Sequence, residues 1–426
     1  MYVKAVQFLK QQYLVFLHVL FLLFLFFIYK LSGLHQFNVN TGGLVNFDAY
    51  WYSNLKEHGY IFSDKAQSNT GFYPTLSFVW KFTGLSALGI SIFNGIIFLF
   101  SFLLLSKEFS FNNKEKLLLL SIPSLIFTYV PYTEYLFFFA STILLIGLRK
   151  QNMFYILIGV LLGSFIRPVT IIFIPSLIFI ELLSNKSYLQ KLIRISLFSI
   201  VSVIALLLVA IIQWLQTGVW LAYYKSQYIQ WDRSLHIPRF PLTTWGGPRI
   251  LWLDGTAFWL GLIAIGLCIF FLFKKESKIK LDDSSLFSFS FLSGATLLVF
   301  LFDGYSENGG TSIMGLNRYF FATPFFFLAF LEFLRLPPVS KKRTALLILS
   351  LIGVWILFGA YTSIDWYNRT KTIIYFSILT LSVLGYFLIL NNKWMLEKRI
   401  WILLYIANCM LQAYLFFRFL SGNWVG

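Results

Sequence analysis

Long runs of apolar residues, separated by short polar or charged segments, dominate the pattern of this chain. Stretches such as 12–29 and 195–215 approach the roughly 20 apolar residues that a helix needs to cross about 30 Å of hydrocarbon. Polar and apolar positions do not alternate as in barrel strands, and a helix satisfies its own backbone hydrogen bonds, so helices are expected. We predict about 11–13 spans, near 12–31, 86–105, 117–131, 134–148, 153–166, 168–183, 195–215, 256–273, 285–302, 319–334, 345–362, 371–390 and 400–420.

The composition supports the same fold class. The chain is 58% hydrophobic and 20% aromatic, and only 12% of its residues are charged. A soluble domain has about 25% charged residues, so most of this protein's surface is expected to face lipid. The chain is therefore predicted to be an all-α polytopic membrane protein, with residues 1–426 in a single integral-membrane domain.

The basic residues predict the orientation in the membrane. Lysine and arginine concentrate in alternate connections between the spans, near 4–10, 107–116, 149–150, 186–194, 274–280, 335–343 and 393–399. By the positive-inside rule these connections and the N-terminus are cytoplasmic, so the net charge of +17 is mainly a topology signal and does not indicate nucleic-acid binding. The outer face then carries the longer polar loops, at 32–85, 214–255 and 303–318, and we expect function there. The Phe- and Lys-rich composition is typical of a prokaryotic plasma (inner) membrane protein; in a eukaryote the endoplasmic reticulum is expected.

The outer segment "VNFDAYWYSNLKEHGY" (45–60) combines charge, aromatic rings and glycine. Read as a helix over 48–59, it places Asp48, Trp51 and Tyr52 on one side and directs Glu57 away from them. One interpretation is a short amphipathic helix on the membrane surface, in which Asp48 is the N-cap and Gly59 ends the helix. The alternative is that Asp48 belongs to an active-site loop.

Further charged residues fall on the same predicted face. Arg167 follows apolar residues and precedes a proline; it either extends to the membrane interface or lines a polar cavity. Glu134 opens a helix, where a carboxylate favours the N-terminal dipole. Arg318 begins another predicted span, and the 214–255 loop contains further arginines, a histidine and tryptophans: Trp231, Arg233, His236, Arg239, Trp245 and Arg249. Arginines on the outer face are exceptions to the positive-inside rule, and their charge is appropriate for binding an anionic head group.

Glycosyl transfer from a polyprenyl-phosphate sugar needs such a set of residues. The outer face has no supply of nucleotide sugars, so the donor must arrive attached to a lipid. In an inverting displacement, a carboxylate takes the proton from the acceptor hydroxyl while arginines stabilise the departing lipid phosphate. Asp48 is the carboxylate best placed for the first task. Only four histidines occur and no metal-binding spacing is present, so no metal or other cofactor is expected.

At these residues the sequence resembles the PIG-V-like family of integral-membrane mannosyltransferases, which belong to the GT-C glycosyltransferase superfamily. "FDAYWYSNLKEHGY" (47–60) is similar to that family's W-D-[AS]-x-W-Y-x-x-I-A-x-x-G-Y signature, with Phe47 in place of the usual Trp. Further similar stretches follow in the family's order: "FYPTLSFV" (72–79), "YTEYLFFFAS" (132–141), "SFIRPVTII" (164–172) and "GLNRYFFATPFF" (315–326), the last with Asn317 as a departure.

The resemblance implies a GT-C-like bundle with an extracytoplasmic active site, Asp48 as the catalytic carboxylate and a polyprenyl-phosphate mannose as donor. The acceptor would be a glycolipid, a glycan or a protein, and membrane lipids are the other expected partners. Together with the outer-face pattern, it gives a predicted substrate-binding set of Trp51, Tyr52, His58, Tyr60, Tyr73, Glu134, Arg167, Arg233, His236, Trp245, Arg318 and Tyr319.

Two alternative functions remain open. A flippase or transporter of lipid-linked sugars could use outer arginines to bind a head group in transit, although few charges lie deep in the spans and no internal repeat is evident. An O-antigen-ligase-like enzyme would instead take a whole oligosaccharide from a lipid diphosphate.

Overall fold

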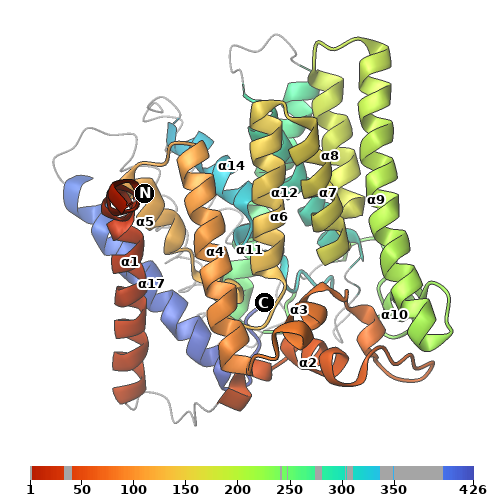
Figure 1. Ribbon diagram of the computed structural model, residues 1–426, viewed down its shortest axis with the longest axis horizontal. Coiled ribbons are helices and arrows are strands. Elements are labelled where there is room, and N and C mark those ends of the chain that lie inside the picture. Colours follow the sequence, from red (N-terminus) through yellow and green to blue (C-terminus); the bar gives the residue numbers. More distant parts are fainter. Residues whose placement is uncertain are drawn as a thin grey trace.

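The computed structural model describes residues 2–32, 41–239, 242–246, 248–273, 281–302, 304, 310–335, 349 and 397–426 (Figure 1). These residues are mostly helical and form no β-strand; Thr243 and Ser312 make one isolated parallel bridge. The α-helices are α1 (Tyr2–Leu31), α2 (Asp48–His58), α3 (Thr75–Thr83), α4 (Ala87–Glu108), α5 (Asn113–Leu120), α6 (Glu134–Lys150), α7 (Met153–Ile166), α8 (Thr170–Leu183), α9 (Tyr188–Thr217), α10 (Ala222–Ile229), α11 (Pro248–Phe273), α12 (Asp283–Phe302), α13 (Leu316–Phe321), α14 (Pro324–Arg335) and α17 (Glu397–Leu420), with 3₁₀ helices η1 (Thr41–Val45), η2 (Asn69–Gly71) and η3 (Pro123–Thr128).

Within the described residues, six helices are long and apolar enough to cross a membrane. They are Tyr13–Leu31 of α1, Ala87–Glu108, Tyr188–Thr217, Ile250–Phe273 of α11, Asp283–Phe302 and Trp401–Leu420 of α17. Each corresponds to a span predicted from the sequence. The protein is therefore an all-α polytopic integral membrane protein.

The predicted spans 134–148, 153–166 and 168–183 correspond to α6, α7 and α8, of 17, 14 and 14 residues, which are shorter than the roughly 20 residues typical of a membrane-spanning helix. The remaining predicted spans differ in the structure or are not described by it. The predicted span 117–131 is instead the end of α5 followed by η3, because Pro123 interrupts the helical hydrogen bonds. The span 319–334 is likewise divided into α13 and α14 before Pro324. Predicted spans 345–362 and 371–390 lie, apart from residue 349, outside the described residues.

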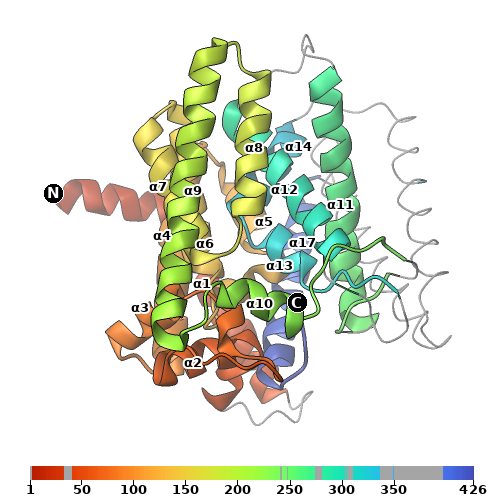
Figure 2. The ribbon, with the colours of Figure 1, turned by 90° about the vertical axis from the view of Figure 1, so that its right-hand side faces the viewer.

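The short helices of two polar loops gather at one end of the bundle. α2 and α3 come from the 32–85 loop and α10 from the 214–255 loop, and they lie near one another at the lower end of the bundle in Figures 1 and 2. Figure 1 also shows that α4 and α9 extend further toward this layer than α6, α7 and α8 do. The inner helices thus end above the layer, which is where the candidate site is found.

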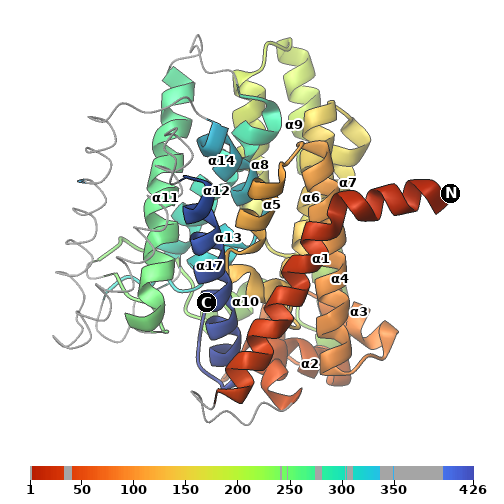
Figure 3. The ribbon, with the colours of Figure 1, turned by 90° about the vertical axis from the view of Figure 1, so that its left-hand side faces the viewer.

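Helices α6 and α7 pack closely because glycines face the partner backbone. A Cβ atom on Gly159 would come within 2.6 Å of the Leu144 backbone nitrogen, and one on Gly147 within 2.7 Å of the Ile156 nitrogen. Small residues of this kind allow close helix packing in membranes, where van der Waals contact replaces the hydrophobic effect. On the opposite flank α1 and α17 lie side by side (Figure 3), with Phe26 stacked on Phe416 at 4.7 Å.

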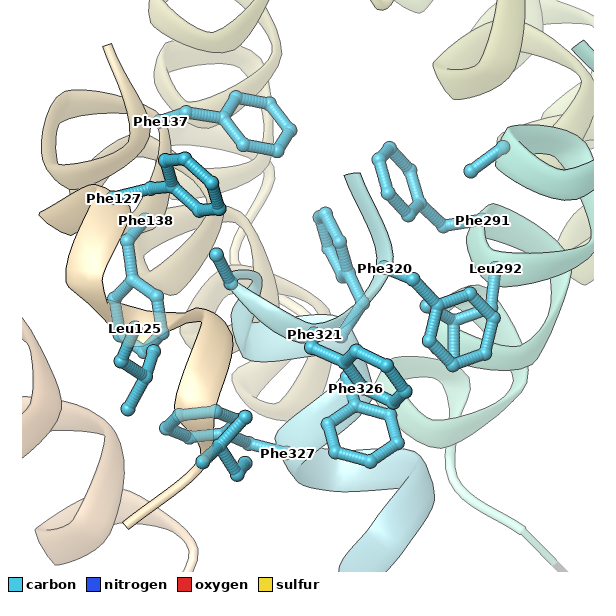
Figure 4. Close-up of a cluster of buried hydrophobic side chains, with 14 of the residues drawn as sticks. Leu125, Phe127, Phe137, Phe138, Phe291, Leu292, Phe320, Phe321, Phe326 and Phe327 are labelled. Carbon is cyan, nitrogen blue, oxygen red and sulfur yellow. The ribbon is translucent and has the colours of Figure 1, made fainter. Parts of the chain in front are cut away.

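A cluster of phenylalanines fills the centre of the bundle (Figure 4). Phe291 of α12 and Phe325 of α14 have ring centres 4.1 Å apart, and Phe137 of α6 lies 5.9 Å from Phe291. These side chains are almost fully buried. They join α6, α12 and α14, and so fix the helix ends that carry the polar site.

Candidate active site

Asp48 is the first residue of α2. The N-cap position belongs to Phe47, and no side-chain hydrogen bond caps this end, so the N-cap role considered for Asp48 is wrong. Phe47 has a φ of 55°, which is rare for a side chain of this size and marks local backbone strain. The Phe47 ring packs edge-on against Trp424 at 4.9 Å and also contacts Phe419, which holds the strained turn in place. Gly59 ends α2 as predicted, with a φ of 73°.

The Asp48 carboxylate belongs to a chain of four charged side chains. Arg318 Nη1 donates to Asp48 Oδ2 at 2.7 Å, and Arg318 Nε donates to Glu134 Oε1 at 2.5 Å. Arg167 Nη2 donates to the same Glu134 oxygen at 2.5 Å, and Arg167 Nε donates to Thr133 Oγ1 at 2.8 Å. The order Asp48, Arg318, Glu134, Arg167 alternates in sign and its formal charge sums to zero.

Burial differs strongly along this charged chain. Glu134 is 1% exposed and each arginine 5%, whereas the side chain of Asp48 is 21% exposed. Arg167 therefore does not extend to the interface, the first of the two possibilities considered for it. Charges at this depth are tolerated because each is paired. Asp48 is the member that remains accessible.

Prolines and helix starts explain how these side chains reach the same point. Glu134 begins α6 directly after Pro131, Tyr132 and Thr133, so its carboxylate lies at a helix N-terminus. Pro168 disfavours the helical conformation of the residue before it, and Arg167 is extended, with φ −145° and ψ 155°. The turn between α7 and α8 consequently directs Arg167 toward the start of α6.

Aromatic rings surround the two guanidinium groups. Arg318 lies 4.6 Å from the ring centre of Tyr132, and Arg167 lies 5.3 Å from that of Tyr319. Burial opposes the charge of Arg318, but the carboxylates of Glu134 and Asp48 raise its pKa above the ordinary arginine value. Burial, followed by the charge of Asp48, also raises the pKa of Tyr132 well above its usual range. Arg318 therefore remains cationic and Tyr132 remains a neutral phenol.

A second buried cluster positions the helix that carries Arg318. Asp254 Oδ1 accepts hydrogen bonds from the Asn317 backbone N–H at 3.0 Å and from Asn317 Nδ2 at 2.7 Å. Thr244 Oγ1 donates to the other oxygen of Asp254, and Ser124 Oγ donates to Asn317 Oδ1. The departure at Asn317 thus has a structural role in this chain. The sequence analysis missed Asp254, although an acid within an apolar run is itself a signal because it requires a partner.

A cavity of about 830 Å³ lies against the charged residues. Asp48, Arg167, Arg233, Arg318 and Tyr319 form much of its polar lining. Its remaining walls are mainly apolar and come from α8, α9 and α12: Ile171, Ile174, Pro175, Leu206, Val209, Leu298, Val299 and Phe302. The cavity therefore has a charged region that contains three arginines and an adjoining hydrophobic region.

Aromatic residues from the segments around η2 and α10 also line this cavity. Phe72 and Trp231 both contribute, and their rings meet edge to face at 5.7 Å. Trp51 stacks on Phe72 at 5.9 Å, so it supports the wall from behind. Tyr73 and Tyr223 also line the cavity, with their ring centres 5.0 Å apart. Phe72, Tyr223 and Trp231 were not among the predicted site residues.

The structure brings together most, but not all, of the predicted set. Asp48, Tyr52, Tyr73, Arg167, Arg233, Arg318 and Tyr319 line the cavity, and Glu134 lies directly behind Arg167 and Arg318. Five predicted residues are not part of the lining: Trp51, His58, Tyr60, His236 and Trp245.

The residues outside the lining have identifiable environments. His58 is exposed at the end of α2 and contacts Asn54, and Trp245 is 71% exposed beside Trp424. Tyr60 is buried and donates to the Phe72 carbonyl at 2.8 Å. His236 Nδ1 lies 3.2 Å from the carbonyl of Ser234.

Two further arginines were candidates for binding the phosphate. Arg239 is exposed and is not part of the cavity lining, while the side chain of Arg249 lies outside the described part of the chain. Arg167, Arg233 and Arg318 thus remain as the candidates that reach the cavity.

Among the described residues, no group of three or more His, Cys, Asp or Glu side chains is arranged to hold a metal ion. Comparisons with protein-family models, with characterised proteins and with solved structures returned no match for this chain.

Proposed function

We propose that this protein is a membrane glycosyltransferase that moves a hexose, with mannose as the expected sugar, from a polyprenyl-phosphate donor to an acceptor with inversion. We further propose that it belongs to the PIG-V-like group of GT-C enzymes and works on the extracytoplasmic face. The observation that carries the proposal is the position of Asp48. Its carboxylate is accessible and lies in a line of buried arginines, at the polar end of a largely apolar cavity.

The shape of the cavity suits a substrate that is polar at one end and a hydrocarbon at the other. Ile171 of α8 and Leu206 of α9 line it, and they are 55% and 37% exposed. The apolar wall thus continues to the outside of the bundle between α8 and α9. A prenyl chain could enter along this wall directly from the bilayer, while its phosphate moved toward Arg167 and Arg318.

The charged residues supply the chemistry of an inverting transfer. The acceptor hydroxyl attacks C1 of the sugar, its oxygen forms the new C1–O bond, and Asp48 takes its proton. The bond from C1 to the phosphate oxygen breaks, and its electron pair leaves with the lipid phosphate. Arginines next to that oxygen stabilise the added negative charge. Phe72 and Trp231 offer ring faces on which a sugar can rest.

Supplying alternative donors to the purified protein tests this proposal. Membrane extract of the host provides acceptors, and the radiolabelled donors are polyprenyl-phosphate mannose, the corresponding diphosphate sugar and a nucleotide mannose. We expect label to enter a product only from the lipid monophosphate. Transfer from the diphosphate donor alone would favour the O-antigen-ligase-like reaction.

A vesicle assay separates the enzyme from a transporter. Protein reconstituted in vesicles that contain labelled lipid-linked sugar, without acceptor, should not change the fraction of label accessible from outside. Movement of the label across the bilayer, with no product formed when acceptor is supplied, would overturn the proposed function in favour of a flippase.

A further inference from the structure

We propose that Glu134 holds Arg167 and Arg318 as a pair that receives the phosphate of the donor, and that Asp48 occupies this position until the phosphate replaces it. The inference rests on the proposed function and identifies which arginines bind the leaving group. Arg167 and Arg318 share a bond to Glu134, and Arg233 also lines the cavity.

Glu134 fixes the spacing of the two guanidinium groups. A single oxygen, Oε1, accepts from Nε of Arg318 and from Nη2 of Arg167, both at 2.5 Å. Since Glu134 is 1% exposed and begins a helix packed in the core, this anchor cannot easily move. Both arginines also line the cavity, so a phosphate that enters it would meet two guanidinium groups held by one carboxylate. Two guanidinium groups held in this way can bind several oxygens of one phosphate.

The charge balance indicates that Asp48, and not Glu134, is the carboxylate that the phosphate displaces from the arginine pair. Two arginines and Glu134 carry a net charge of +1, and Asp48 neutralises it. A sugar phosphodiester brings another negative charge into a cavity with mainly apolar walls, where like charges repel strongly. Of the two carboxylates, Asp48 is the more exposed, at 21% of its side chain, and it begins the short helix α2. Replacement of Asp48 by the phosphate restores neutrality around the arginine pair.

This replacement would make the ability of Asp48 to accept a proton depend on donor binding. While Arg318 binds Asp48, the charge of the carboxylate is directed at the guanidinium. Once the phosphate occupies Arg318, Asp48 is free to accept the hydrogen of an acceptor hydroxyl. After transfer the phosphate has gained a charge and Asp48 has gained a proton, so both changes favour the bond of Arg318 to the phosphate. We therefore expect the donor to bind before the acceptor reacts.

A binding assay without any sugar tests the replacement. Farnesyl phosphate, as a short lipid monophosphate, is titrated into the purified full-length protein in detergent, and its dissociation constant is measured by calorimetry. The Asp48→Asn variant should bind it more tightly than wild type, by on the order of tenfold, because the competing charge on Arg318 is gone. Asp48→Glu, which keeps the charge, should not show this gain, and Arg318→Gln should bind weakly.

Three controls locate the source of the effect. Glu57→Gln removes an exposed carboxylate from the same helix and should leave binding unchanged. Farnesol has the lipid without the phosphate, and inorganic phosphate has the anion without the lipid; both should bind more weakly than farnesyl phosphate. Thermal unfolding of each variant verifies that it is folded.

The outcomes separate this inference from the proposed function. Equal or weaker binding by a folded Asp48→Asn variant, or no binding to wild type, would overturn the inference. Tighter binding without sugar transfer by wild type would support the phosphate site and refute the glycosyltransferase. Transfer by wild type without tighter binding in Asp48→Asn would support the glycosyltransferase and refute the replacement of Asp48 by the phosphate.

Discussion

At the scale of single residues, the two carboxylates of the site differ in exposure and in the number of arginines that they bind. Glu134 binds two arginines and is buried, whereas Asp48 binds one and remains accessible. Carboxylates of the same chemical type thus have different tasks because their surroundings differ. In the proposed mechanism Glu134 positions the two arginines, and Asp48 is the candidate base.

Removing the charge of Glu134 should destabilise the protein strongly. In Glu134→Gln two buried guanidinium groups lose their shared counter-charge, and the free energy of unfolding should fall by about 3 kcal/mol or more. Chemical unfolding in detergent measures this change. Glu57→Gln is the matched control, since Glu57 is 55% exposed, and its effect should stay within about 0.5 kcal/mol. Equal stability of the two variants would show that the shared carboxylate is not needed to hold the arginines.

The site was only partly predictable from the sequence. An arginine before proline, or an acid at a helix start, signals a residue that needs a partner, but it does not say which partner. Asp48 and Arg318 form a pair although they are 270 positions apart in the sequence. This pairing results from tertiary packing, and local sequence patterns carry no information about it. Local pattern also could not separate Tyr73, which lines the cavity, from the exposed His58.

At the scale of elements, helix ends position the site. α6 begins at Glu134, α7 ends before Arg167, and α13 carries Arg318 on a short segment held by Asp254 and Asn317. The long spans were predictable because a run of 20 apolar residues has few alternatives in a membrane. The breaks within 117–131 and 319–334 were not predicted. Both segments were assigned as continuous spans on their hydropathy, although Pro123 and Pro324 lie within them.

The end of α2 offers a test of how this layer is fixed. Gly59 has φ 73° and ψ −168°, a conformation almost restricted to glycine, and an added Cβ would lie 2.9 Å from Gln216 Oε1. That oxygen also accepts the Tyr60 backbone N–H, so Gly59→Ala strains the contact between the α2 loop and α9. We expect a loss of about 1–3 kcal/mol in unfolding free energy, measured by denaturant titration.

Gly84→Ala is the appropriate comparison for this substitution. Gly84 also has a positive φ, of 61°, but no atom lies within 4 Å of an added Cβ, so only the backbone cost of about 1–2 kcal/mol remains. A smaller loss in Gly59→Ala than in Gly84→Ala would argue against the tight junction with α9.

At the scale of the whole molecule, the described part of the chain has six helices long and apolar enough to cross a membrane, and shorter helices assemble a layer at one end. Residues of α2 and α10 and residues of α8, α9 and α12 line the same cavity, and most of its apolar wall comes from α8, α9 and α12. This arrangement would let a lipid-borne substrate reach a polar centre without leaving the membrane.

The orientation of the layer can be tested by labelling introduced cysteines in intact cells. By the distribution of basic residues, Lys65→Cys in the α2–α3 loop should react with a membrane-impermeant maleimide, and Asn185→Cys in the α8–α9 turn should react only after permeabilisation. Both positions are exposed, and wild type, whose two cysteines lie in membrane-spanning helices, gives the background. The reverse pattern would put the cavity mouth on the cytoplasmic side.

The most direct test of the account is the rate of mannose transfer from a polyprenyl-phosphate donor by Asp48→Asn, compared with Glu57→Gln. Both substitutions remove one carboxylate from α2, but only Asp48 lines the cavity. If Asp48 is the base, its variant should stay folded and lose about 10²- to 10⁴-fold in rate, while Glu57→Gln keeps the wild-type rate. A folded Asp48→Asn variant that transfers mannose within tenfold of wild type would contradict the central claim.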